Sequence, residues 1–196
     1  DGSQEELETI QKYLLPSKSK LLLWNDANEI NIKNLNLNNY KIIHFATHGE
    51  LAGTIQGQNE PFLVLTPPQT GTNENDGLLT MSEIMNLENN AELVILSACN
   101  TAGGNIKQSE GFSGLARAFL FSGSKSVLVS NWYVETYAAM ELTTNMIKQL
   151  KDNPKISTSK ALTKSMKNFV KKNNNKSHPF YWAPFVIVGL NSNINL

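Results

Sequence analysis

The sequence of 196 residues contains a single cysteine, Cys99, so no disulfide can form within the chain. A lone cysteine suits a reducing compartment. No apolar run approaches the roughly 20 residues that a membrane helix needs, and the first residues lack the basic start and the apolar stretch of a signal peptide. We therefore expect a cytoplasmic protein without a membrane span.

Neither sign of charge is in excess, because Lys plus Arg and Asp plus Glu both number 17. No overall field draws the chain to nucleic acid or to an anionic membrane. Four lysines at positions 160, 164, 167 and 171 share one face of a predicted helix. They could contact nucleic acid, but no aromatic residues are interleaved with them for base stacking, and a solvated helix face is the simpler interpretation.

Six short apolar runs predict six β-strands. The runs are continuous rather than alternating, which is typical of strands covered on both faces in a mostly parallel sheet. They are residues 21–24, 42–45, 62–65, 93–96, 127–129 and 185–188.

Apolar residues at helical spacing separate several of these runs. They predict helices over residues 111–122, 139–150 and 162–170, the first capped by Gly123. Thr80 and Glu83 have the spacing of a capping box at another helix start. Strands alternating with helices predict one three-layer α/β domain, with helices on both faces of the sheet.

Two histidines lie four positions apart, His44 inside the strand predicted at residues 42–45 and His48 three residues after it. Zinc ligands with this spacing lie on a helix and normally enclose a Glu, whereas here Phe, Ala and Thr lie between them. We therefore expect no metal and no cofactor. We expect His44 to be a hydrogen-bonded core residue and His48 to lie at the rim of the sheet. Gly49 is either a turn residue or a glycine whose N–H can approach a substrate carbonyl.

Cys99 follows the strand predicted at residues 93–96 and opens a loop of small residues. Open α/β folds bind ligands at the carboxyl edge of the sheet, so Cys99 is a candidate nucleophile. The alternative is a buried structural cysteine. A neighbouring His48 would lower the pKa of the thiol and protonate a leaving amine.

Six sequence blocks spread over nearly the whole chain form one pattern. They are ATHG at 46–49, DGLLTMSEI at 76–84, LSACNT at 96–101, EGFSGLARAF at 110–119, VSNW at 129–132 and HPFYWAPF at 178–185. In this order they resemble the CHAT domain, a caspase-like family often found behind tetratricopeptide repeats. The resemblance implies a caspase-hemoglobinase fold for residues 1–196 and, in active members, a cysteine endopeptidase with a His/Cys dyad.

The resemblance maps the dyad onto His48 and Cys99, which are about 50 positions apart, as in caspases. The backbone amides of Gly49 and Cys99 could then form the oxyanion hole. The segment Ser130-Asn131-Trp132 would bind the substrate backbone as an added strand. Ser97 and Ala98 would lie beside the pocket for the residue that precedes the cut.

Two features depart from the family pattern. The chain begins at a helix predicted for residues 5–14, so we expect the usual first strand and any upstream repeats to be absent from it. Trp132 is followed by Tyr133-Val134-Glu135, where members have a hydrophobic residue and a proline.

From these features we expect a protein or peptide substrate and an upstream repeat region or regulatory partner. We expect neither a membrane partner nor direct nucleic-acid binding. The alternative function is a catalytically silent module that binds a peptide along the sheet edge.

Overall fold

The computed structural model describes residues 2–69, 71–72, 75–97 and 107–196, without the side chains of residues 107–113. Its main sheet has four strands in the order β1-β5-β6-β7. These strands are β1 (Ile42–Phe45), β5 (Leu93–Leu96), β6 (Ser126–Ser130) and β7 (Phe185–Gly189). The first three are parallel and β7 is antiparallel to β6. The mostly parallel sheet that the sequence predicts is confirmed, and it is consistent with a caspase-like fold.

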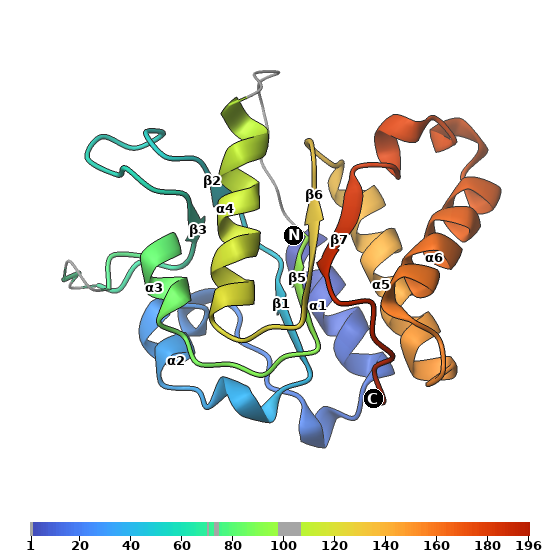
Figure 1. The fold of residues 1–196 in the computed structure, drawn as a ribbon, viewed down its shortest axis with the longest axis horizontal. Coiled ribbons are helices and arrows are strands. Elements are labelled where there is room, and N and C mark those ends of the chain that lie inside the picture. The colour runs from blue at the N-terminus through green and yellow to red at the C-terminus, as the bar shows by residue number, and fades with distance from the viewer. Residues whose placement is uncertain (1, 70, 73–74, 98–106) are drawn as a thin grey trace.

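Helices cover both faces of this sheet (Figure 1). On one side lie α2 (Glu29–Lys33), α3 (Met81–Met85) and α4 (Lys107–Phe121), and on the other α1 (Gly2–Tyr13), α5 (Thr136–Asp152) and α6 (Thr158–Lys172). Successive residues of a strand point to opposite faces. Val94 therefore packs with the first group of helices and Ile95 with the second. All four residues of β5 are buried, which explains its continuous apolar sequence.

The helix ends follow the local sequence signals. Gly123 has a φ of 116°, and its N–H donates to the Leu120 carbonyl at 3.2 Å while that of Ser124 donates to the Phe119 carbonyl at 3.0 Å. This is the Schellman pattern, so the predicted glycine cap of α4 is confirmed. The predicted capping box of α3 is also present, with Thr80 N–H donating to Glu83 Oε2 at 2.8 Å.

Two of the six strand predictions need correction. Residues 62–65 do contain a strand, β3 (Phe62–Val64), but it belongs to a second, antiparallel sheet with β2 (Gly49–Glu50) and β4 (Leu78–Thr80). An apolar run does not reveal which strands it will pair with. Residues 21–24 form no strand. Leu22 packs against the core from an irregular segment, and Trp24 turns the chain with a φ of 52°.

Candidate functional site

The two strands that lead to the predicted dyad lie side by side. β1 and β5 are parallel, and Phe45 pairs with Leu96 at their carboxyl ends. His48 is the third residue after Phe45, and Cys99 is the third after Leu96. Three extended residues span at most about 11 Å, so His48 cannot lie farther than that from the end of β1. His48 is exposed. Cys99 and Ala98 lie outside the described residues.

The backbone around His48 is held by β3. Val64 N–H donates to the His48 carbonyl at 2.8 Å, and the Thr47 hydroxyl donates to the Val64 carbonyl. Gly49 is thus opposite Leu63 at a position of the antiparallel ladder that is not hydrogen-bonded, so its N–H points away from β3. Gly49 is the first residue of β2 rather than a turn residue. Its amide is oriented outside the β2–β3 ladder.

His44 is the hydrogen-bonded core histidine that the sequence predicts. Its side chain is 7% exposed, and its Nε2 lies 3.0 Å from Glu6 Oε1 and 3.0 Å from Ser97 Oγ. A carboxylate can only accept hydrogen bonds, so Nε2 carries a proton and donates it. Nε2 is therefore engaged within the protein. Among the described residues, no group of three or more His, Cys, Asp or Glu side chains could hold a metal ion.

The partner of His44 is Glu6, which the sequence motifs do not include. Its side chain is 4% exposed, and it accepts a hydrogen bond of 2.7 Å from the Thr143 hydroxyl of α5. Burial by itself raises the pKa of the Glu6 carboxyl. The opposing charge and hydrogen bond of His44, with the hydroxyls of Thr143 and Ser97, outweigh burial and lower that pKa below its ordinary value of 4.5. Glu6 therefore stays ionised at neutral pH.

A sequence signal for Glu6 was available. Glu6 lies four residues before Ile10 and so shares the face of α1 that the buried Ile10 turns to the core. A charged residue in the apolar stripe of a helix needs a buried partner. The identity of that partner could not be read locally, because His44 is on a different element far along the chain.

The segment Ser130-Asn131-Trp132 lies at the end of β6. Ser130 is fully buried, and its Oγ has no hydrogen-bond partner among the described residues. Asn131 N–H donates to the Pro184 carbonyl at 2.9 Å. Trp132 is half-buried, and its Nε1 donates to the Phe180 carbonyl at 3.0 Å. The Asn131 amide is thus occupied within the protein, and a substrate strand would have to use other backbone groups of the segment.

Two surface features bear on the predicted partners. The lysines at positions 160, 164, 167 and 171 are all exposed on α6, as a solvated helix face requires. In the described part of the chain, no helix combines the length and the apolar character needed to cross a membrane.

Comparison with known proteins gives a family assignment. The family model described as "CHAT domain" matches residues 1–190. Two curated relatives are similar over part of the chain, both called "Tetratricopeptide repeat protein 28". The mouse protein is 30% identical over 122 residues and the human protein 31% identical over 118 residues. Each match covers 60% of this chain and 5% of the relative. The family match extends over nearly the whole chain, which therefore belongs to the CHAT domain family.

Proposed function

We propose that the chain is a caspase-like cysteine endopeptidase that cleaves a protein substrate with His48 and Cys99. One observation carries the proposal. Parallel neighbours β1 and β5 end in register at Phe45 and Leu96, and each is followed at the third position by one member of the dyad. The exposure of His48 supports a role that needs contact with substrate.

The proposed reaction uses only groups of this chain. The Cys99 thiolate attacks the carbonyl carbon of the scissile peptide, and its electron pair forms the new C–S bond. The N–H groups of Gly49 and Cys99 stabilise the resulting oxyanion. The orientation of the Gly49 N–H away from β3 supports this role. Protonated His48 gives its proton to the departing amine as the C–N bond breaks, and water then hydrolyses the thioester.

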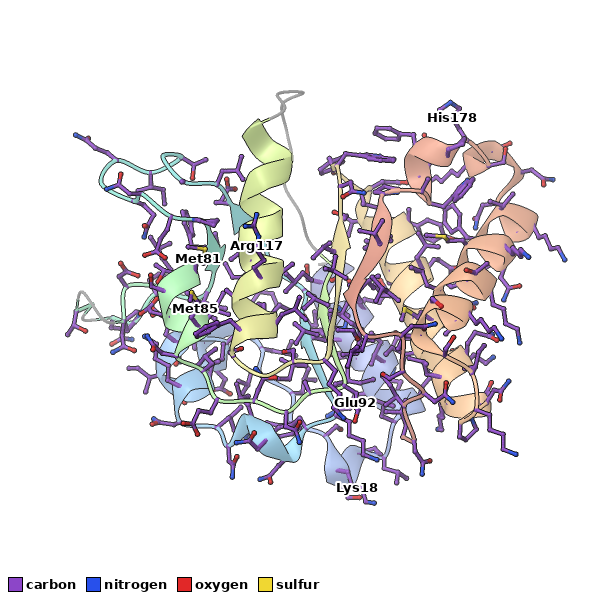
Figure 2. The ribbon with its side chains drawn as sticks, in the orientation of Figure 1. Lys18, Met81, Met85, Glu92, Arg117 and His178 are labelled. Carbon is purple, nitrogen blue, oxygen red and sulfur yellow. The ribbon has the colours of Figure 1, made fainter. Side chains whose placement is uncertain are left out.

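Cleavage of a peptide library by purified protein tests the proposal. We expect the wild-type chain to cleave and both Cys99→Ala and His48→Ala to lose cleavage while keeping the far-UV circular dichroism of the wild type. His178→Ala is the matched control. His178 is an exposed histidine in the segment between α6 and β7 (Figure 2), and its Nδ1 accepts the Phe180 N–H at 3.2 Å. Cleavage retained by Cys99→Ala would refute the proposal. A folded wild-type protein that cleaves nothing would favour the silent peptide-binding module instead.

A further inference from the structure

Four buried polar residues interrupt the apolar face of the sheet that α1 and α5 cover. They are Glu6 on α1, His44 on β1, Ser97 directly after β5 and Thr143 on α5. Ser97 and Thr143 are 3% and 1% exposed. The surrounding core on this face is apolar, including Ile95, Leu128 and Leu142. We call these four residues the strand-end network.

The network joins four elements through one carboxylate. Glu6 Oε1 accepts from His44 Nε2 at 3.0 Å and from the Thr143 hydroxyl at 2.7 Å. His44 Nε2 also lies 3.0 Å from Ser97 Oγ, which connects β1 directly to the end of β5. The Ser97 N–H donates to the Phe45 carbonyl at 3.2 Å and adds a second link between these strand ends.

Burying this polar network in the core is energetically unfavourable compared with packing apolar side chains there. Moving a carboxylate out of water is unfavourable, and well-packed apolar residues of similar volume are often as stabilising as a buried ion pair. The pKa of Glu6 is lowered rather than raised, which shows that its neighbours compensate its burial. His44 Nδ1 has no hydrogen-bond partner among the described residues. The network still has a property that an apolar cluster lacks, because its directional hydrogen bonds fix the relative position of the groups they join.

The network fixes the chain positions that come just before the two dyad residues. His44 precedes His48 by four residues on the same chain segment, and Ser97 precedes Cys99 by two. The hydrogen bond between His44 and Ser97 therefore links the two segments just before the dyad residues. Glu6 approaches this link from α1, which lies on the same side of the sheet as α5 (Figure 1).

We propose that Glu6 is a positioning residue that acts through His44 and Ser97 to hold the ends of β1 and β5 at the spacing that the dyad requires. The inference rests on the proposed function and adds to it a dependence of the dyad on α1. A misplacement of about 1 Å in an active site can slow a reaction about a hundredfold. The loss of Glu6 should therefore reduce dyad reactivity in protein that is still folded.

Alkylation of Cys99 by iodoacetamide at pH 7 tests the inference without a substrate. Cys99 is the only cysteine, so every adduct found by mass spectrometry reports on it. We expect Glu6→Ala to slow alkylation about ten- to a hundredfold relative to wild type, toward the rate of His48→Ala. Glu6→Gln keeps an oxygen that can accept from His44 and Thr143, and it should stay within about threefold of the wild-type rate.

The matched control is Glu29→Ala. Glu29 is a buried glutamate on α2, bonded to Lys33 Nζ at 2.9 Å and to the Gly77 N–H at 2.6 Å, and it lies on the other side of the sheet. We expect the Glu29→Ala variant to be less stable than wild type, while its Cys99 is alkylated at the wild-type rate. If Glu6→Ala does not fold, Thr143→Val replaces it, because that variant removes only the hydroxyl that orients Glu6. It should slow alkylation severalfold.

The possible outcomes separate the two proposals. If His48→Ala alkylates as fast as wild type, the dyad itself is refuted. If His48→Ala is slow and a folded Glu6→Ala or Thr143→Val matches the wild type, only the positioning role of Glu6 is overturned. A Glu29→Ala variant that slows as much as Glu6→Ala would likewise overturn it, because the effect would then follow from lost stability.

Discussion

The substitution Glu6→Gln should destabilise the protein at neutral pH and much less in acid. It replaces a carboxylate by an amide of nearly the same size within the strand-end network. Hydrogen bonds to a charged group contribute about 1.5–3 kcal/mol and neutral ones about 0.5–1.5 kcal/mol. Glu6 has such bonds from His44, Thr143 and Ser97. Since a neutral amide is cheaper to bury, the net loss should be about 1–3 kcal/mol at pH 7.

The pH dependence follows from the direction of the Glu6 pKa shift. The folded-state pKa lies below the ordinary value of 4.5. Between these two values the unfolded chain binds more protons than the folded one, so stability rises with pH. The contribution of Glu6 is fully present above about pH 4.5 and is lost as the pH falls through the folded-state pKa. Glu6→Gln has no such proton to bind, and the stability gap between it and wild type should close in acid.

Urea unfolding monitored by tryptophan fluorescence at several pH values between 7 and 3 measures this gap. Met146→Ala on α5 is the matched control. Met146 is fully buried, and its truncation should cost about 2–5 kcal/mol without changing any titrating group. Its deficit should stay constant with pH. A deficit of Glu6→Gln that is the same at pH 7 and pH 3.5, or that grows in acid, would refute the assigned electrostatics of the network.

Two further predictions concern the scaffold that carries the site. Gly123→Ala should destabilise the protein by about 1–3 kcal/mol from the positive φ of this residue alone. The loss should be larger still, because a Cβ there would lie 2.0 Å from the Asn89 carbonyl oxygen. A wild-type unfolding midpoint in urea would contradict this. Thr80→Ala should cost about 1 kcal/mol, because it removes the hydroxyl that accepts the Glu83 N–H. An unchanged thermal midpoint for Thr80→Ala would show that this cap is not needed.

The elements of the main sheet could be predicted because each carries a local signal. The apolar runs of β1, β5, β6 and β7 and the glycine that ends α4 need no information from distant residues. The pairing of strands into sheets has no such local signal. The sequence of Phe62–Val64 does not show which sheet it joins. Strands of the central sheet and of the small antiparallel sheet can both be short apolar runs.

For the candidate site, the sequence predicts the dyad but not the buried neighbours of His44. The sequence resemblance marks His48 and Cys99, and the structure pairs Phe45 and Leu96 at the ends of the two strands that precede them. The link between Glu6 and His44 could not be predicted, because it depends on how α1 docks on the sheet. Hydrogen bonds between distant elements follow from tertiary packing rather than from local periodicity.

The pH profile of Cys99 alkylation is the sharpest test of the proposed dyad of His48 and Cys99. A free thiol has a pKa of about 8.5, and a neighbouring imidazole lowers it. If His48 and Cys99 form a dyad, alkylation of wild-type protein stays fast well below pH 8.5, His48→Ala loses this fast phase and His178→Ala keeps it. A wild-type profile centred near pH 8.5 and unchanged by His48→Ala would contradict the dyad.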